Sequence, residues 1–437
     1  MSETKYCVAV IGAGPAGLFG ARELANQGVR VALFNRDIKP GGLAEYGIYP
    51  EKHMMKEGLR KQFRGALDNP NLEYFGNIII GDNGDITLNE LRELGFDAIL
   101  VSAGAQGTKW LGLPGENLEG VYHAKEVVYA YNNLPPFSQK NFRFGKRCAI
   151  IGAGNVMVDI ARHLINVQKV DEVIAVVRRG PNEVNFTKEE MKHLISYLDL
   201  DEFDKEMARV QPTLQTVNQN LETGRQKILD SLAKADPKTS SAKFHFDFLA
   251  SPTAMFGENG ALTQLEVEDN ILTERDGKIS AKGTGTKRQL DVDTVIFAIG
   301  DKVDESFGLP TQWNEFIKNK EPHFPVDGVS YESTIEGIFV GGWSRKASEG
   351  LVGYARKDGT NASKAVTQYL QTHQPINSDP EAIAAKIKGL SKPVITKDDI
   401  KRLEIVEAEE AKKRELEEFK FSSNEEMLQA MGLIETA

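Results

Sequence analysis

Cysteine is scarce in this chain of 437 residues, which contains only Cys7 and Cys148. Each lies in an apolar run just before a glycine turn, where a buried strand residue is expected. The lack of a CxxC pair excludes a dithiol relay of the kind found in disulfide reductases. Two thiols are also too few for a cysteine-ligated iron–sulfur cluster, which needs about four. Any electron transfer would therefore depend on a bound organic cofactor, and we predict no metal site.

Long apolar runs are also missing, because none approaches the roughly 18 residues that a membrane span requires. The first residues lead straight into an apolar run and a glycine turn, with no basic, apolar or Arg/Ser-rich targeting segment before them. We therefore expect a cytoplasmic protein without a membrane span, unless a presequence was removed. The net charge of −10 argues against nucleic acid as the main partner.

Glycine is well represented, and the first informative group is the turn GAGPAG that begins at Gly12. An apolar run at residues 6–11 precedes it, and a helix-like segment follows before a second apolar run at 29–34. In a strand–helix–strand unit the first glycine permits a tight turn, Gly14 lets the backbone approach a pyrophosphate, and Gly17 allows close packing of helix and strand. The pattern predicts a dinucleotide site.

The residue after the second strand departs from this pattern. An acidic residue normally accepts hydrogen bonds from the ribose there, but this chain has Asn35. An amide can also bond a hydroxyl, and Asp37 lies two residues on. We therefore predict that Asn35 contacts the adenosine half, and how the ribose is held stays open.

The same arrangement recurs in the middle of the chain. The apolar run 147–151 leads into the turn GAGNVM, with glycines at Gly152 and Gly154 and with Met157 where the third glycine would be. A helix-like segment and a further apolar strand at 171–177 complete the unit. It predicts a second dinucleotide site.

Arg178 and Arg179 follow the last strand of this second unit, where an NAD site would have a carboxylate. A pair of guanidinium groups binds a 2′-phosphate through charge-assisted hydrogen bonds, whereas a carboxylate would repel it. A solvated surface pair is the alternative. The position favours NADPH as the second ligand, and the first site, without an arginine pair, suits FAD. Two such sites in one chain suggest a hydride transfer between the two cofactors.

Two apolar strands that end at glycine, residues 97–104 and 293–300, mark where the chain leaves one domain for the other. The length agrees with two domains. We predict an α/β protein with two Rossmann-like dinucleotide-binding domains, the NADPH domain being inserted in the FAD domain. The expected bounds are 1–108 and 303–437 for the FAD domain and 109–302 for the NADPH domain.

Two other segments are rich in polar and charged residues. Residues 201–240 are helix-prone and weakly patterned, so we expect a helical excursion without evident chemistry. The charged tail 395–437 ends in a predicted helix with a capping box at Ser423 and Glu426. Its run of charges is typical of a solvated face.

Trp343 follows an apolar strand and a pair of glycines, and Gly350-Leu351-Val352 come shortly after it. An aromatic ring at such a turn could stack on an isoalloxazine ring, and the backbone N–H groups of residues 350–352 could bond its pyrimidine edge. A tryptophan of the core fits the same pattern.

Several motifs, which cover nearly the whole chain in order, match one known family. They are ILVSAGA at 99–105, LGLPGE at 111–116, GNVMVDIAR at 154–162, RRGPNEVNFTKEE at 178–190 and GW…GLV at 342–352. Together they resemble adrenodoxin reductase and its bacterial ferredoxin–NADP reductase relatives, and more distantly the NADPH-oxidising subunit of glutamate synthase. In such enzymes NADPH reduces FAD by hydride transfer, and the flavin passes electrons singly to an iron–sulfur protein.

The glycine turns and this resemblance together imply roles for individual residues. Those expected to line or hold the FAD are Gly12, Gly14, Ala16, Gly17, Leu43, Ile80, Trp343, Gly350, Leu351 and Val352. Those expected to bind the NADP are Gly152, Ala153, Gly154, Asn155, Val156, Arg178, Arg179 and Glu190. The resemblance also places Gly350 by the nicotinamide and Asp159 near the flavin. Asp159 and His53 are candidates for tuning flavin protonation, and a structural hydrogen bond is the alternative for each.

Four departures from the family pattern cluster where an electron acceptor or substrate would approach. Asn35 replaces a ribose-binding Glu, and Glu45 stands in place of the family's arginine. The family's histidine falls at Lys52, with His53 one place on, and the residues after Trp343 differ as well. These changes leave the acceptor open.

Three functions are compatible with these residues. A reductase of an acidic ferredoxin would need a basic face, and Lys56, Arg60 and Arg64, with Lys61 alongside, recur on a predicted helix. An ordinary amphipathic surface helix explains them as well. A flavin dehydrogenase or oxidase would act on a small molecule at the altered face around Glu45 and His53, and a regulatory flavoprotein would sense the NADPH/NADP⁺ ratio. The acceptor, the physiological direction and the oligomeric state stay open.

Overall fold

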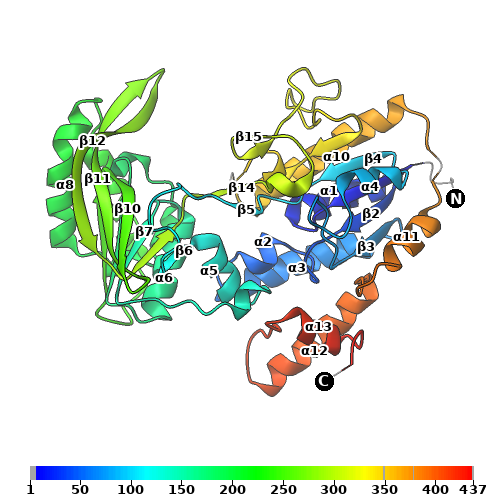
Figure 1. The fold of residues 1–437 in the computed structure, drawn as a ribbon, viewed down its shortest axis with the longest axis horizontal. Helices are drawn as coiled ribbons and strands as arrows, with labels where there is room; N and C mark the ends of the chain where they lie inside the picture. The colour runs from blue at the N-terminus through cyan, green and yellow to red at the C-terminus, as the bar shows by residue number, and fades with distance from the viewer. Residues whose placement is uncertain (1–5, 348–349, 377, 436–437) are drawn as a thin grey trace. The chain divides into compact units, whose positions relative to one another are not determined.

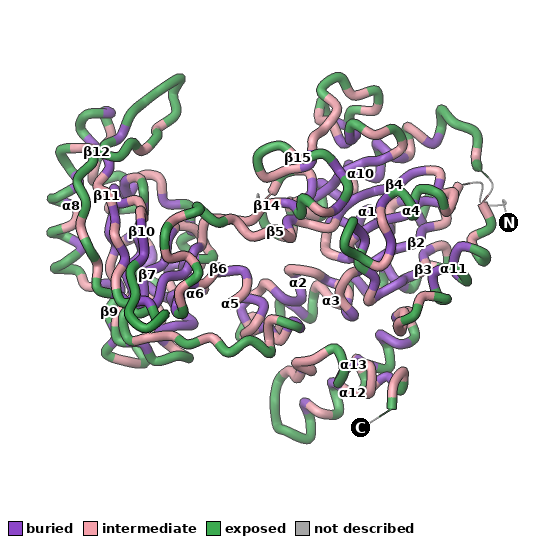
Figure 2. Tube along the Cα trace, in the orientation of Figure 1, coloured by how far each residue is buried: buried purple, intermediate pink, exposed green. Residues whose placement is uncertain are grey.

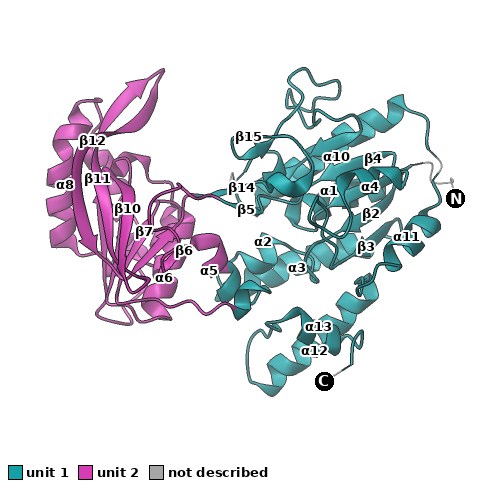
Figure 3. Cartoon of the chain, in the orientation of Figure 1, with its two compact units in different colours: residues 1–108, 129–139, 300–437 teal, residues 109–128, 140–299 magenta. Residues whose placement is uncertain are grey.

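The computed structural model describes residues 6–347, 350–376 and 378–435. The chain forms two compact units, which Figure 3 colours separately. The first unit contains residues 1–108, 129–139 and 300–437, and the second contains 109–128 and 140–299.

These units differ from the expected domain bounds at residues 129–139, which the sequence placed in the NADPH domain and which lie in the first unit. Aromatic packing gives the reason, because Tyr129 packs with Tyr46 and Phe137 in one hydrophobic cluster. The chain also returns to the first unit at Gly300, three residues before the expected boundary. The helix that crosses between the units is α5 (Ala124–Tyr131).

A parallel sheet in the order β17-β4-β1-β2-β3 forms the centre of the first unit. Its strands are almost entirely buried, as expected for a sheet that is covered on both faces (Figure 2). Its members are β1 (Cys7–Ile11), β2 (Arg30–Phe34), β3 (Leu72–Phe75), β4 (Ala98–Val101) and β17 (Ile338–Val340). The two crossing segments of the chain pair antiparallel as β5 (Gly107–Thr108) and β14 (Asp301–Lys302).

Helices cover both faces of this sheet (Figure 1). A Cβ on Gly359 would lie 2.1 Å from the carbonyl oxygen of Ala16, so glycine lets α10 (Val352–Thr372) pack closely on α1 (Pro15–Asn26). α3 (His53–Leu67) adds Phe63 to the same core, with its ring centre 5.9 Å from that of Phe19. The opposite face is covered by α4 (Leu88–Glu93) and α11 (Pro380–Lys388).

The second unit repeats this plan with a parallel sheet in the order β6-β13-β7-β8-β9. An antiparallel sheet, β10-β11-β12, packs on it through Met255, Leu265 and Val267. The strands are β6 (Val121–His123), β7 (Arg147–Ile151), β8 (Glu172–Val177), β9 (Lys243–Phe248), β10 (Ala250–Glu258), β11 (Ala261–Arg275), β12 (Lys278–Asp291) and β13 (Thr294–Phe297). The helices include α6 (Asn155–Asn166), α7 (Lys188–Met191), α8 (Leu200–Gln215) and α9 (Leu221–Leu229). The predicted α/β class with two Rossmann-like parts is confirmed, and α8 and α9 form the predicted helical excursion.

The charged tail is less solvated than its sequence suggests. It forms α12 (Lys397–Lys413) and α13 (Asn424–Ala430), and α13 has the predicted capping box at Ser423 and Glu426. Met427 joins the hydrophobic core of the first unit, and Glu407 and Lys420 are buried. The prediction of a solvated face is therefore wrong for one side of this tail. Among the residues that the structure describes, no helix combines the length and the apolar character that a membrane crossing requires.

Candidate active site

The first glycine turn joins β1 to α1, and its shape requires glycine at two positions. Gly12 has a φ of +101°, and a Cβ on Gly17 would lie 1.8 Å from the carbonyl oxygen of Gly12. At Gly14, by contrast, a Cβ would meet no atom within 4 Å, so the space in front of this residue is open. α1 begins here without a side-chain cap, which leaves its first N–H groups for a ligand. The turn therefore fits the pyrophosphate that the sequence predicts.

The carboxyl ends of β4 and β17 lie at the same edge of the sheet as this turn. Gly104, after β4, donates its N–H to Ser344 Oγ at 2.9 Å, which fixes the short turn that carries the half-buried Trp343. α10 then begins without a side-chain cap, just after Gly350 and Leu351, and Leu351 is 70% exposed. These are the positions at which the sequence predicts stacking on the flavin ring and contacts to its pyrimidine edge.

Asp358 holds this turn in place, and sequence reasoning missed it. Its carboxylate accepts the N–H of Gly342 at 2.6 Å and binds the Arg345 guanidinium at 2.6 Å. Tyr331 donates its hydroxyl to the same carboxylate at 3.2 Å. The only signal in the sequence was an acidic residue in an otherwise small-residue stretch of a helix, which is too common to be informative.

Asn35 is tied to the protein itself. Its Oδ1 accepts the N–H of Ala13 in the glycine turn at 3.1 Å. Its Nδ2 donates to the carbonyl oxygens of Asp37 at 2.8 Å and Lys39 at 3.0 Å, and it lies 3.2 Å from the hydroxyl of Tyr74. Both donors of the amide are thus used inside the protein. The ribose contact of Asn35 stays a prediction, and the structure adds a second use, which is to join β2 to the turn.

The other residues predicted at the flavin lie at different depths of the first unit. Ala16 is buried in the first turn of α1. Leu43 is half-buried at the start of α2 (Leu43–Tyr46), beside the aromatic cluster of Tyr46. Ile80 is buried in the core on the α4 face. His53 begins α3, and its Nδ1 lies 3.1 Å from a carboxylate oxygen of Glu417. Their contacts with FAD stay predictions.

The second glycine turn, between β7 and α6, has the same construction as the first. Gly152 has a φ of +137°, and a Cβ there would lie 2.4 Å from the carbonyl oxygen of Ala298. A Cβ on Gly154 would again meet nothing within 4 Å, and α6 begins without a side-chain cap. Met157, at the place of the third glycine, is completely buried. The open space at Gly154 fits a second pyrophosphate.

Arg178 and Arg179 follow β8 directly and are exposed and half-buried, respectively. Their backbone is fixed, because Asn270 Nδ2 donates to the Arg178 carbonyl at 2.9 Å and Leu249 N–H donates to the Arg179 carbonyl at 3.2 Å. Neither guanidinium forms an ion pair with any residue that the structure describes. In the first unit, Arg36 lies at the corresponding strand end, but it is paired with Asp37 at 2.9 Å. The second site therefore has free cations for a phosphate.

The loop after these arginines is bound to the second glycine turn. Asn155 Oδ1 accepts the N–H of Thr187 at 2.8 Å, and the carbonyl of Ala153 accepts the N–H of Asn185 at 2.8 Å. The half-buried Glu190 lies in α7, just beyond this loop, and the half-buried Asp159 lies in the second turn of α6. Val156 is 45% exposed in the first turn of α6. The predicted NADP residues thus lie on adjoining segments.

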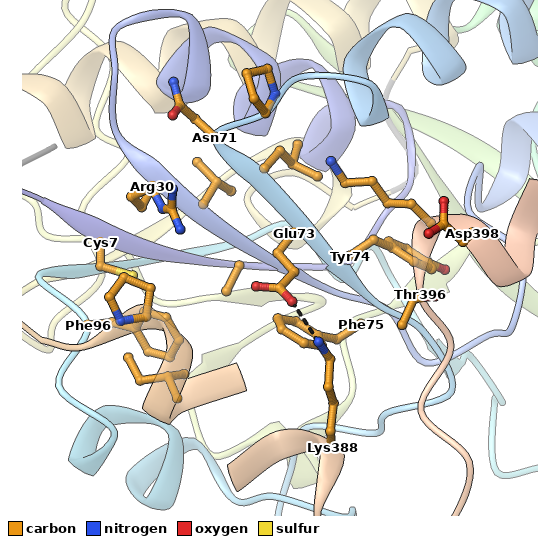
Figure 4. Close-up of a pocket in the computed structure, with 17 residues that line it drawn as sticks. Cys7, Arg30, Asn71, Glu73, Tyr74, Phe75, Phe96, Lys388, Thr396 and Asp398 are labelled. Carbon is orange, nitrogen blue, oxygen red and sulfur yellow. Dashed lines mark hydrogen bonds and ion pairs between the residues drawn. The ribbon is translucent and has the colours of Figure 1, made fainter. Parts of the chain in front are cut away.

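A cavity of about 380 Å³ lies along the edge strand β3 and the first half of β2, and Figure 4 shows its lining. Glu73 and Lys388 form an ion pair of 3.0 Å in this lining, and Arg30 and Asn71 also line it. The lining includes no residue of the two glycine turns or of the Trp343 turn. This cavity is therefore separate from the candidate active site.

A model of the pyridine nucleotide-disulphide oxidoreductase family matches residues 6–198 of the chain. The chain is 27% identical over 387 residues to the NADPH-ferredoxin reductase FprA of Mycobacterium leprae, which covers 80% of this chain and 81% of that protein. It is 28% identical over 384 residues to the mitochondrial NADPH:adrenodoxin oxidoreductase of Arabidopsis thaliana, with 79% and 78% covered. The chain is thus similar over most of its length to NADPH-ferredoxin reductase and NADPH:adrenodoxin oxidoreductase. The resemblance that the motifs indicated is thus confirmed.

Two solved structures have a fold similar to that of this chain. Mycobacterium tuberculosis FprA in complex with NADPH gives a TM-score of 0.80 at 24% identity, covering 98% of this chain and 99% of that one. Thioredoxin reductase of Lactococcus lactis gives a TM-score of 0.52 at 18% identity, covering 84% and 100%. Both likenesses show the fold of the chain.

The basic helix α3 fits an ordinary amphipathic helix, one of the two interpretations that the sequence left open, better than a docking ridge. Lys56 is buried, with 1% of its side chain exposed. Arg60 binds Glu45 at 2.6 Å, and Arg64 binds Glu404 at 3.0 Å. These cations are used within the first unit, because the tail brings carboxylates to them. Lys56 and Arg60 therefore do not form an exposed ridge, whereas Arg64 is 42% exposed.

The surroundings of the two cysteines make both thiols unreactive. Both are buried and free, and burial raises the pKa of each thiol to about 12. A thiol that stays protonated at neutral pH is a poor nucleophile. Cys7 and Cys148 are thus buried strand residues, as predicted. Across the described ranges, no group of three or more His, Cys, Asp or Glu side chains could hold a metal ion.

Acid should destabilise the second unit through His163 in α6. Burial lowers the pKa of this histidine to about 4. Between pH 6.5 and pH 4 the unfolded chain therefore binds a proton that the folded chain does not, so the free energy of unfolding falls as the pH falls. We expect a loss on the order of 3 kcal/mol across this window. Urea unfolding at several pH values measures it.

His163→Gln should remove most of this pH dependence, because glutamine does not titrate. The matched control is His323→Gln, whose side chain is 76% exposed. If wild type and His163→Gln lose stability in parallel between pH 6.5 and pH 4, burial of His163 is not the cause.

Proposed function

We propose that this chain is an NADPH-dependent flavoprotein reductase, which holds FAD in its first unit and NADPH in its second. It passes the electrons to a small iron–sulfur protein of the ferredoxin class. The observation that carries this proposal is the repeated glycine turn, with its open position at the uncapped start of a helix. Arg178 and Arg179, which have no ion-pair partner among the described residues, favour NADPH at the second site. Relatives named NADPH-ferredoxin reductase and NADPH:adrenodoxin oxidoreductase support the cofactor and the kind of acceptor.

The residues of the chain contribute positioning more than acid–base catalysis. The first N–H groups of α1 and α6 would bind the two pyrophosphates, and Arg178 and Arg179 the 2′-phosphate. When bound, FAD would accept a hydride from NADPH and release electrons one at a time. Trp343 and the start of α10 would cover the flavin ring and exclude water from it. Asp159 and His53 are the candidates for holding a proton near the ring.

A reaction on a small molecule at the face of Glu45 has less support. The side chain of Glu45 is only 3% exposed and is bound by Arg60 and Lys420, so a substrate has no access to it. His53, beside that face, is paired with Glu417. No observation favours a purely regulatory flavoprotein. A cytoplasmic location stays a prediction.

Reduction of a ferredoxin tests this function. We expect the FAD-loaded protein, mixed anaerobically with NADPH and a two-iron ferredoxin, to bleach the visible absorbance of the ferredoxin. NADH at the same concentration is the control and should be much slower. If NADPH reduces the flavin but no ferredoxin accepts the electrons, the proposed acceptor is wrong, while the assignment of FAD and NADPH is supported. A protein that binds no FAD contradicts the whole proposal.

A further inference from the structure

A buried ion cluster joins the charged C-terminal tail to residues 39–60 of the first unit. Its members are Lys39, Glu45, Lys56, Arg60, Glu407, Glu418 and Lys420. The tail supplies the last three of them. Five of the seven side chains are less than 10% exposed. Desolvating so many charges is costly unless each has well-placed partners, so the arrangement requires a close fit of the tail.

Glu45 lies at the centre of this cluster. Lys420 Nζ lies 2.9 Å from its carboxylate and also donates to its backbone carbonyl at 2.8 Å. Arg60 donates to both carboxylate oxygens, at 2.6 and 2.7 Å. Burial alone would raise the pKa of Glu45, but Lys39, Lys420 and Arg60 hold it well below its usual value. Glu45 is therefore a charged anchor for cations from both the tail and the body of the unit.

The anchor connects directly to the predicted FAD site. Glu45 belongs to α2, and the segment before this helix is bonded to the first glycine turn, because Gly41 donates its N–H to the Ala13 carbonyl at 2.7 Å. Leu43, a predicted FAD contact, begins the same helix. The ammonium group of Lys420 thus holds α2 through both the side chain and the backbone carbonyl of Glu45. A change at residue 420 would therefore reach the flavin site through a single one-turn helix.

The cluster also accounts for a departure from the family pattern. An arginine at position 45, as the family has it, would face Lys39, Arg60 and Lys420 in a buried site. Like charges at such distances repel strongly in a medium of low polarity. The acidic residue at position 45 and Lys420 of the tail thus complement each other.

We propose that the C-terminal tail is part of the FAD site and that Lys420 is a positioning residue, which holds α2 against the glycine turn through Glu45. This inference rests on the proposed function, because it requires that FAD binds in the first unit. The tail then acts on flavin affinity and on the surroundings of the flavin ring, without contacting the reacting atoms.

Lys420→Met tests this role, because it keeps much of the side chain's length and removes its charge and its hydrogen bonds. We expect the FAD dissociation constant to rise about tenfold or more, since two hydrogen bonds from a buried ammonium group to Glu45 are lost. The visible circular dichroism of the bound flavin should change as well, and Lys420→Arg should restore most of both. Titration of the apoprotein with FAD, followed by flavin fluorescence, gives the dissociation constant.

Two further variants separate positioning from general stability. Lys413→Met removes a charge from the same tail, at a side chain that is 67% exposed and paired with Glu410 on the same helix, and should match wild type. The double variant Glu45→Gln with Lys420→Met removes one charge of each sign, and should bind FAD no more weakly than Lys420→Met alone, because the two residues act as one unit.

The inference is overturned if Lys420→Met lowers the Tm of the apoprotein but leaves the FAD dissociation constant and the flavin spectrum unchanged. A double variant that binds FAD more weakly than Lys420→Met alone would also overturn it. A wild-type protein that binds no FAD would instead refute the proposed function on which the inference rests.

Discussion

Replacing Arg178 or Arg179 by alanine is expected to raise the NADPH concentration for half-maximal flavin reduction about tenfold or more, at ~1.4 kcal/mol per decade. NADH should be little affected, because it lacks the 2′-phosphate that these side chains would bind. The reason is geometric as well as electrostatic. The backbone of both residues is fixed by hydrogen bonds at the end of β8, while neither guanidinium has an ion-pair partner among the described residues.

A matched control is Arg275→Ala in the same unit, at a side chain that is 92% exposed. It makes the same change of charge away from the second glycine turn, and flavin reduction by NADPH and by NADH should be unaffected. Single-turnover reduction of the flavin by each cofactor, over a range of concentrations, measures the effect. An equal loss for NADPH and NADH in Arg178→Ala would show that the arginine does not recognise the 2′-phosphate.

Gly14→Ala and Gly154→Ala should separate the two cofactor sites without unfolding either unit. A Cβ at each position meets no protein atom within 4 Å, so the apoprotein should fold. The same methyl group would occupy the space that the pyrophosphate needs. We expect Gly14→Ala to weaken FAD, and Gly154→Ala to weaken NADPH while FAD stays bound, each by about a hundredfold or about 3 kcal/mol.

Two comparisons sharpen this prediction. Gly58→Ala, in α3, also has no neighbour within 4 Å, lies away from both turns and should bind both cofactors normally. Gly17→Ala would place a Cβ 1.8 Å from the Gly12 carbonyl and should disrupt the fold itself. Calorimetry of the apoproteins and titration with each cofactor distinguish the cases. If Gly14→Ala binds FAD as tightly as wild type, the first turn does not hold the pyrophosphate.

Local patterns predicted the parts of the site that depend on local backbone shape. The turns at Gly12 and Gly152 follow apolar strands and precede helices, and both the spacing and the glycines are consequences of the bend itself. Arg178 and Arg179 were found for the same reason, since their place is set by the end of one strand. These features require only residues that are near in sequence.

Features that depend on distant residues could not be predicted in this way. Lys420 and Glu45 are 375 residues apart, so nothing in either segment indicates that they meet. The two interpretations of the basic helix could not be separated from the sequence, because Glu418 and Glu404, which bind Arg60 and Arg64, come from the tail. Asp358 was missed for the same reason, because its role becomes visible only when α10 packs beside the Trp343 turn.

The most direct test of the central claim is anaerobic stopped-flow mixing of the FAD-loaded protein with NADPH and, separately, with NADH. The account predicts that NADPH bleaches the flavin absorbance rapidly and that NADH, at the same concentration, does so far more slowly. A flavin that NADH bleaches as fast as NADPH would contradict the assignment of the second site. A flavin that neither cofactor reduces would contradict the proposed transfer of a hydride to FAD.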